Sequence, residues 1–326
     1  MKTFITGGTG FIGTHLVRRL LHSGHEVSCL VRRITPGSEQ LTKQGVTFSI
    51  GDVTDKESVL RSMKGCDWVF HLAGIYSFWE PDNTIFKDVN VNGTRNVMEC
   101  ALETKVSKVV HVSTVGIYGK PDDCPFTEES KVGPVRFCEY FQTKYEGDLI
   151  VWEFYKTIGL PVVVVYPSSV LGPGDPKATG QYIINLMRRR LPATVFNDAI
   201  LTFVHVKDVA EVLVRAAEKE NNIGEKYLIG KHQMSFREIN QTVSEISGVP
   251  LPRLRLPDSL TMANAAFLTG LANLLKKPPL WGMSTGQMKV MQEGFRVDGS
   301  KAERELGISY TPIRVALEEA IASYQI

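Results

Sequence analysis

A short apolar run, Lys2–Thr6, leads directly into a glycine-rich stretch, and an apolar-periodic segment follows over residues 11–21. Three glycines of that stretch, Gly7, Gly10 and Gly13, have the spacing GxxGxxG. Glycine allows the backbone to turn sharply and to approach another group closely. The succession therefore predicts a strand, a tight loop and a helix whose free N–H groups and positive dipole end face an anion.

Strands and helices are predicted to alternate through the first half of the chain. The expected strands lie at 2–6, 26–32, 46–50, 67–72, 108–113 and 160–166, and the expected helices at 11–21, 55–63, 83–103 and 138–157. Strands that are apolar throughout are typical of a parallel sheet buried on both faces. We therefore predict an α/β protein with a Rossmann-type doubly wound parallel sheet, whose ligands bind outside the carboxyl ends of the strands.

In that fold the glycine loop predicts a dinucleotide site, and the end of the second strand helps to choose the dinucleotide. An acidic residue there would suit NAD, but the chain has Val31 followed by Arg32 and Arg33. A guanidinium pairs bidentately with a 2′-phosphate and stacks on adenine, so NADP (NADPH) is favoured over NAD, with two exposed surface arginines as the alternative. Further cofactor contacts are expected from the loop residues Thr9, Phe11 and Ile12, from Asp52 and Val53 near the adenine, and from Leu72, Ala73 and Gly74. The alternative for Asp52 is a local role at the start of the next helix.

Three residues form a candidate catalytic set. Thr114 ends the fifth strand, Tyr140 follows 26 positions later, and Lys144 lies four residues beyond Tyr140 on the same face of a predicted helix. A free tyrosine has a pKa of about 10, roughly three units too high for proton exchange near neutrality, or about 4 kcal/mol. A cation about 5 Å away at an effective dielectric of about 20 contributes roughly 3 kcal/mol towards the phenolate. Lys144 and a positively charged nicotinamide ring are thus expected to activate Tyr140, while the Thr114 hydroxyl, preferred to Ser113, polarises the reacting oxygen.

The second half of the chain differs in character, because prolines interrupt shorter helices and a few brief strands near 202–205 and 226–229. We expect residues 1–166 to form the NAD(P)-binding Rossmann domain that carries the catalytic residues. Residues 167–326 are expected to form a smaller, mostly helical, substrate-binding region, with some segments returning to the Rossmann core. The uncharged segment 259–275 is compatible with a lid, an interface or a membrane-surface element.

Composition excludes several classes of function. Lysine plus arginine (37) nearly balance aspartate plus glutamate (35), so the formal charge of +2 does not indicate a nucleic-acid partner. Five cysteines without a CxxC pair favour a reduced, cytoplasmic compartment, and the seven scattered histidines predict no metal site. The strand beginning at Lys2 leaves no room for a signal peptide, and the 17 residues of 259–275 fall short of a membrane span, which needs about 20 apolar residues.

Taken together, these motifs resemble the extended short-chain dehydrogenase/reductase family over essentially the whole chain. The resemblance is carried by GGTGFIG at 7–13, GDV at 51–53, HLAG at 71–74, NVNGTRNV at 90–97, VSTVGIYG at 112–119, YFQTK at 140–144, PSSVLGPG at 167–174 and FVHVKDVA at 203–210. It implies that Thr114, Tyr140 and Lys144 are catalytic and that Asn90 supports the helix after the fourth strand. It also implies cofactor contacts from Pro167, Ser169 and Val170, and a homodimer built on the helices near 83–103 and 138–157.

Within that family the Val31-Arg32 strand end resembles the dihydroflavonol-reductase type. The segment 75–82, the 167–175 run and the 295–307 tail resemble a subgroup labelled hopanoid-associated sugar epimerases, a likeness that names no substrate.

Three positions depart from the sugar-modifying members of the family. Val115-Gly116 replaces the Asp-Glu pair of 4,6-dehydratases, Leu201-Thr202 replaces an Arg-Asp pair common in nucleotide-sugar epimerases, and Tyr166 replaces a frequent arginine. An apolar pocket is therefore expected, with Tyr76, Trp79 and Tyr118 as substrate-contacting residues and further contributions from 169–172 and the 259–275 helix. Arg188 or Arg190 could restore the missing cation.

The first hypothesis for function is an NADPH-dependent oxidoreductase that reduces a small-molecule ketone or aldehyde to an alcohol, with Tyr140 as the proton donor. The alternative is an NAD-dependent sugar or nucleotide-sugar epimerase using the same three residues. A third possibility, a dinucleotide-sensing protein without catalysis, fits less well because such relatives lose the Tyr/Lys pair.

Overall fold

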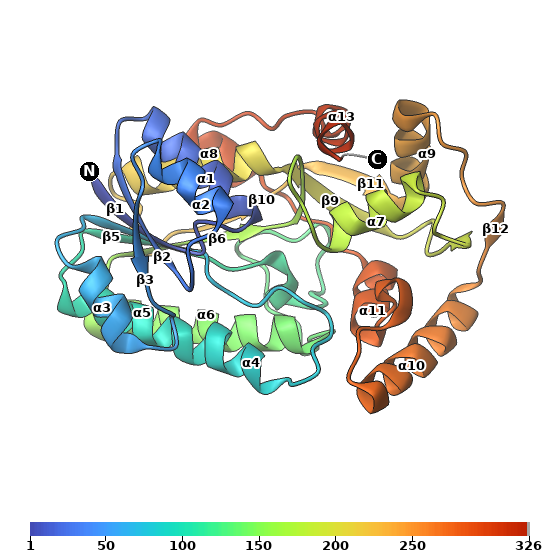
Figure 1. The fold of residues 1–326 in the computed structure, drawn as a ribbon, viewed down its shortest axis with the longest axis horizontal. Coiled ribbons are helices and arrows are strands. Elements are labelled where there is room, and N and C mark those ends of the chain that lie inside the picture. The colour runs from blue at the N-terminus through green and yellow to red at the C-terminus, as the bar shows by residue number, and fades with distance from the viewer. Residues whose placement is uncertain (325–326) are drawn as a thin grey trace.

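The computed structural model of the protein describes residues 1–324 and is built on a seven-stranded parallel sheet (Figure 1). The strands are β1 Lys2–Thr6, β2 Glu26–Val31, β3 Thr47–Ile50, β4 Trp68–His71, β5 Lys108–Val112, β6 Val162–Pro167 and β10 Lys226–Ile229. They are ordered β10-β6-β5-β4-β1-β2-β3. The winding direction reverses between β1 and β4, which makes their carboxyl ends the place where a ligand binds in such folds. The predicted Rossmann-type fold is confirmed.

Helices cover both faces of this sheet (Figure 1). One face packs against α1 Phe11–His22, α2 Pro36–Thr42, α8 Val206–Glu218 and α12 Ser300–Leu306, and the other against α3 Lys56–Met63, α5 Thr94–Glu103 and α6 Glu139–Ile158. Successive strand residues point to opposite sides: Phe4 and Val109 join the core under α5 and α6, whereas Ile5 and Val110 join the core under α1 and α8. Both faces are therefore buried, as the unbroken apolar strands predicted.

The helix expected over 83–103 is divided in the structure. It consists of α4 Thr84–Lys87, a π-helical segment Asp88–Gly93 and α5. The π-helical turn contains Asn90, which is buried. Its side-chain amide accepts a hydrogen bond from the backbone N of Ile75 (2.8 Å) and donates one to the Thr143 hydroxyl (3.1 Å). Such π-helical turns are frequent at functional sites, and this one ties the helix to the segment after β4.

The remaining elements lie mostly beyond the carboxyl ends of the strands (Figure 1). They are the 3₁₀ helix η2 Val115–Tyr118, β7 Ser169–Leu171, α7 Ala178–Met187, β8 Ala193–Thr194, β9 Ile200–His205, β11 His232–Ser235, α9 Phe236–Ser247, β12 Leu254–Arg255, α10 Asp258–Leu275, the 3₁₀ helix η3 Leu280–Gly282, α11 Thr285–Glu293 and α13 Ile313–Ser323. This region has a core of its own, to which α7, α9, α11 and α13 contribute. The second half nevertheless supplies β10, α8 and α12 to the large sheet and its cover. No helix within residues 1–324 is long and apolar enough to cross a membrane.

Candidate active site

The glycine loop between β1 and α1 is as tight as its sequence predicted. Gly7 has φ +77°, and a Cβ there would lie 2.8 Å from the backbone N of Ala73. A Cβ at Gly13 would lie 2.1 Å from the carbonyl oxygen of Gly7. The N-cap of α1 is Gly10, which provides no side-chain cap, and the first turn carries no acidic residue. The N–H groups of this helix end therefore remain available to a phosphate, which is what a dinucleotide requires.

A cavity of about 370 Å³ runs from this loop to the carboxyl ends of β5 and β6. Most of the predicted cofactor and catalytic residues line it together: Gly7, Gly10, Phe11, Ile12, Gly13, Leu72, Gly74, Thr114, Tyr140, Lys144, Pro167, Ser169 and Val170. An elongated ligand anchored at the helix N-terminus would thus extend to the Tyr140 hydroxyl. The residues present fit a dinucleotide.

Other predicted cofactor residues lie outside the cavity lining. Thr9, Arg32 and Arg33 are exposed, and the two arginines directly follow the end of β2. Asp52 uses Oδ1 to accept hydrogen bonds from the backbone N (2.9 Å) and hydroxyl (2.8 Å) of Thr54, in the turn that precedes α3. Its second carboxylate oxygen is not engaged in this turn, so the local role and the adenine contact are compatible. The last three predicted positions are also outside the lining: Val53 and Asn90 are buried, and the backbone N of Ala73 donates to the Thr6 hydroxyl.

Tyr140 and Lys144 occupy the first turns of α6, and Thr114 is the N-cap of η2, where its hydroxyl accepts from the backbone N of Gly116 (3.2 Å). A hydrogen bond with Thr114 lowers the pKa of Tyr140, but burial has the larger effect and raises it well above the ordinary value. Lys144 is buried, which lowers its pKa to about 8, and its Nζ donates to the carbonyl of Val112 (2.9 Å). The site thus consists of the hydroxyls of Thr114 and Tyr140, shielded from water, and the buried amine of Lys144.

Lys144 and the nicotinamide ring are together expected to lower the pKa of Tyr140. In the protein alone, burial raises that pKa and the hydrogen bond with Thr114 lowers it. The burial comes from aromatic rings around the phenol, with the Tyr76 ring 5.2 Å and the Phe78 ring 6.3 Å from the Tyr140 ring between centroids. Activation by the ammonium therefore remains a prediction for the cofactor-bound enzyme.

Asp148 is an ionisable residue of the site that the sequence reasoning missed. It follows Lys144 by one helical turn, and burial raises its pKa to about 6. Its Oδ2 accepts hydrogen bonds from Trp152 Nε1 and from the Tyr166 hydroxyl, each at 3.0 Å. The carboxylate in turn raises the pKa of Lys144 against the effect of burial. The signal was present in the sequence, since Tyr140, Lys144 and Asp148 recur every four residues on one helix face.

Tyr118 was expected to contact substrate, and the structure places it elsewhere. Its side chain is 2% exposed and stacks on Phe126, with 5.1 Å between ring centroids. It lines neither the dinucleotide cavity nor the second cavity described next. Tyr118 is therefore a core residue, because the short η2 turn directs it under the sheet rather than into the site.

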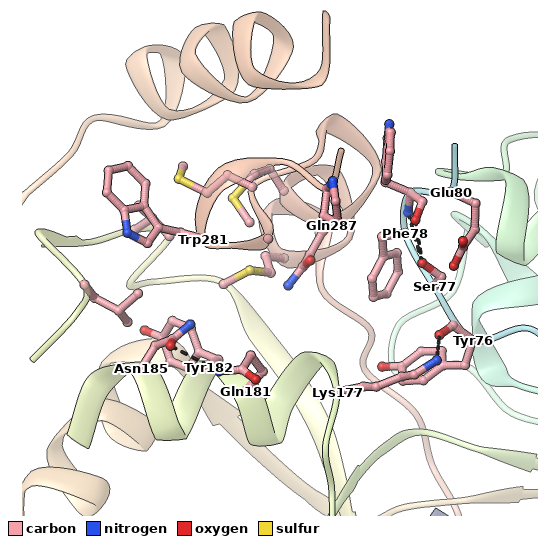
Figure 2. Close-up of a pocket in the computed structure, with 18 of the residues that line it drawn as sticks. Tyr76, Ser77, Phe78, Glu80, Lys177, Gln181, Tyr182, Asn185, Trp281 and Gln287 are labelled. Carbon is pink, nitrogen blue, oxygen red and sulfur yellow. Dashed lines mark hydrogen bonds between the residues drawn. The ribbon is translucent and has the colours of Figure 1, made fainter. Parts of the chain in front are cut away.

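A second cavity, of about 640 Å³, adjoins the first (Figure 2). Tyr76, Phe78, Pro176 and Lys177 line both. Figure 2 shows its walls converging from the segment after β4, from α7 and from the region of η3 and α11. The walls are largely apolar and include Phe78, Trp79, Leu191, Val195, Leu256, Trp281, Met283, Met288 and Met291. Of the predicted substrate residues, Tyr76 and Trp79 line this cavity.

Two further expectations about this cavity need correction. Residues of the 259–275 helix do not line the cavity. The helix is linked to the lining residue Trp79, whose Nε1 donates a hydrogen bond to Asn273 (2.8 Å). Arg188 and Arg190, considered as replacements for a missing cation, lie at the end of α7 outside the lining. The cations that do line it donate to backbone carbonyls: Lys177 to Tyr76 (3.0 Å) and Lys276 to Pro81 (3.2 Å).

The fold and the site define a dinucleotide-binding protein with a Thr/Tyr/Lys set at the end of its parallel sheet. Residues 3–230 match the model of the NAD dependent epimerase/dehydratase family, so the chain belongs to that family, as the resemblance to extended short-chain dehydrogenases/reductases indicated.

Named relatives include both reductases and epimerases. A putative dihydroflavonol 4-reductase of Synechocystis sp. is 32% identical over 99% of this chain and 94% of its own. Sterol demethylase protein B of Methylococcus capsulatus is 31% identical over 100% of this chain and 98% of its own. The solved structure of UDP-glucuronic acid 4-epimerase from Bacillus cereus in complex with NAD superposes with a TM-score of 0.77 at 25% identity, covering 99% of this chain and 98% of that one. The named relatives of this NAD dependent epimerase/dehydratase family thus include reductases and epimerases.

Proposed function

We propose that the protein is an NADPH-dependent reductase that converts a ketone or aldehyde into an alcohol. The observation that carries this proposal is the apolar cavity of about 640 Å³ that continues from Tyr140 through Tyr76 and Phe78. A diphosphate-bearing sugar needs cations directed at its phosphates. Lys177 and Lys276 are the cations of this cavity lining, and both donate to backbone carbonyls. Such walls favour a mainly apolar substrate with a single polar reacting centre.

When bound, a nicotinamide dinucleotide supplies or takes up the hydride. The chain's own residues do the rest. Thr114 holds the reacting oxygen, and Tyr140 gives its hydroxyl proton to that oxygen as negative charge develops. Lys144, one helical turn away, is suited to hold a ribose hydroxyl and to stabilise the phenolate left on Tyr140. The aromatic rings around Tyr140 exclude water, which strengthens these interactions.

The preference for NADPH rests on Arg32 and Arg33. Both are exposed directly after β2, and Val31 occupies the place where an acidic residue would bind the ribose hydroxyls of NAD. Two guanidinium groups can reach and pair with a 2′-phosphate at this edge of the sheet.

An epimerase is the second candidate, and it is favoured by the family and by the epimerase of similar fold. A dehydratase fits less well for a steric reason. A Cβ at Gly116 would lie 2.0 Å from the ring of Phe141, so the position after Val115 has no room for the glutamate of that reaction.

The test is a panel of carbonyl compounds assayed in parallel with NADPH and NADH. Apolar ketones and aldehydes should be reduced with consumption of NADPH, and Tyr140→Phe should lower kcat/KM by about 10²–10⁴-fold without loss of NADPH binding. Tyr155→Phe, the same substitution further along α6 and outside the lining of both cavities, is the matched control for folding. A protein that retains NAD, consumes neither cofactor and interconverts sugars would contradict the reductase and favour the epimerase.

The expected homodimer remains a prediction. Leu102 on α5 and Leu149 on α6 are exposed apolar residues on the helices concerned. Light scattering of the wild type beside Leu149→Glu tests it, since the variant should dissociate.

A further inference from the structure

Helix α10 departs from the usual pattern of a surface helix, because its fully buried residues are small and most of its large apolar residues are exposed. Its buried residues are the small Thr261, Ala265 and Ala272, which face the rest of the protein. In an ordinary surface helix the large apolar residues would occupy that inner stripe. Figure 1 shows α10 at the outer edge of the molecule, with α11 beside it.

Several large apolar residues of α10 point outward, although Met262 packs against the core of this region. Leu260, Phe267, Leu271 and Leu274 are 54%, 68%, 41% and 79% exposed, and their spacings of seven, four and three residues place them on one face. We call these four residues the α10 apolar face. Between Asp258 and the end of the helix no charged residue interrupts it. A continuous exposed apolar face of this kind indicates a binding surface rather than scattered surface hydrophobes.

The residues that follow the helix indicate what binds there. Lys276 and Lys277 are exposed at its C-terminal end, and Leu280 and Trp281 of η3 are 56% and 45% exposed. An apolar helix face bordered by lysines and a tryptophan is the arrangement that settles at the boundary between lipid headgroups and acyl chains. The lysines add attraction to an anionic surface.

The residues that follow α10 also form part of the edge of the second cavity. Lys276, Pro278 and Trp281 line the cavity and are exposed, so the cavity reaches the surface beside the end of α10. We propose that the α10 apolar face rests in the interfacial layer of an anionic bilayer, and that the cavity takes a lipid-like carbonyl compound directly from that layer. The choice of substrate rests on the reductase function proposed above, whereas the attachment to the bilayer does not.

This arrangement explains why a large apolar cavity is combined with an exposed apolar helix. A long-chain or polycyclic ketone is poorly soluble in water, and transfer through water would expose its apolar surface. Entry beside Trp281 lets the apolar part leave the bilayer and enter the cavity without that step. A second copy of the chain is the other occupant to test, but a contact between copies would cover the edge at which the cavity opens.

The binding test uses the full chain and sedimentation with vesicles of phosphatidylcholine alone or mixed with phosphatidylserine. The wild type should bind the mixed vesicles, and Phe267→Glu/Leu274→Glu should weaken binding by about tenfold or more. Lys277→Glu should weaken binding to the mixed vesicles by about fivefold while leaving the neutral ones unaffected. Ile158→Glu, at an apolar position that is 52% exposed at the end of α6, is the matched control and should bind as the wild type does. Thermal melting and NADPH titration confirm that each variant is folded.

An activity assay separates this proposal from the reductase function. The double variant should reduce a short, water-soluble ketone as the wild type does, and should lose at least about tenfold in rate on a lipid ketone held in vesicles. Vesicle binding without reduction of any carbonyl would overturn the reductase and leave the docking surface intact. Equal vesicle binding by the wild type and the double variant, or none by either, would overturn the docking surface. So would a shift of the double variant from dimer to monomer without vesicle binding by the wild type, since a second copy would then cover α10.

Discussion

Removal of the Tyr166 hydroxyl should destabilise the protein by an amount that depends on pH. Tyr166 is 1% exposed, and its hydroxyl donates to Asp148 Oδ2 (3.0 Å) and accepts from Trp152 Nε1 (3.1 Å). Burial raises the pKa of Asp148 from 3.8 to about 6. The carboxyl is therefore mostly protonated at about pH 5 and ionised at about pH 8. Tyr166→Phe removes a donor from a neutral group in the first case and from a buried charge in the second.

The expected cost follows from these two states. A hydrogen bond to a neutral group contributes about 0.5–1.5 kcal/mol, and one to a charged group about 1.5–3 kcal/mol. Tyr166→Phe should thus lower the free energy of unfolding by about 1 kcal/mol at pH 5 and by about 2–3 kcal/mol at pH 8. The stability of the wild type should also fall as the pH rises. Because the folded pKa lies above the unfolded one, the contribution of Asp148 to stability is complete below pH 3.8 and is lost as the pH rises through about 6.

Urea unfolding at the two pH values measures both effects. Tyr182→Phe is the matched control, because the Tyr182 hydroxyl donates to the neutral amide oxygen of Asn240 (2.8 Å). Its cost should be about 1 kcal/mol at either pH. An equal loss of stability at pH 5 and pH 8 for Tyr166→Phe would refute the assignment of a buried, titrating carboxyl next to Lys144.

Three further changes test the cofactor site and the fold. Gly13→Ala would place a Cβ 2.1 Å from the Gly7 carbonyl oxygen, so NADPH affinity measured by fluorescence titration should fall by at least about tenfold; an unchanged Kd would contradict the role of the loop. Arg32→Ala/Arg33→Ala should raise the KM for NADPH by about tenfold or more with little change for NADH, and equal effects on both cofactors would remove the basis for the NADPH preference. Lys108→Met removes a buried amine whose three N–H groups are shared among four acceptors at the C-terminal end of α8, three backbone carbonyls and the Asn222 side-chain oxygen. Urea unfolding should therefore show a loss of about 2 kcal/mol, and a stability equal to the wild type would show that this capping of the helix end is dispensable.

The features that could be predicted from the sequence are those whose cause is local. The glycine loop must be tight because Gly13 leaves no room for a side chain, and the strand and helix on either side have their own periodicities. The helix Pro36–Thr42 was missed because it is short, although Thr35 caps it and Pro36 occupies its first turn. The segment Lys226–Ile229 was expected as a strand, but its pairing with β6 depends on contacts between residues about sixty positions apart, which no local pattern encodes.

The predictions for Tyr118 and for the 259–275 helix differ from the structure for the same physical reason. A tyrosine such as Tyr118 suits a pocket wall and a core equally well, and the direction of one 3₁₀ turn decides between them. The 259–275 helix is apolar on nearly every side, so its composition leaves its inner face undetermined. The inner face is decided by residue size. Helix α11 packs closely against the small residues of α10 near Ala265, and Phe267 and Leu274 are therefore exposed. The direction of that helix is thus a property of the tertiary structure, and it is the observation on which the proposal of a lipid surface as the source of substrate rests.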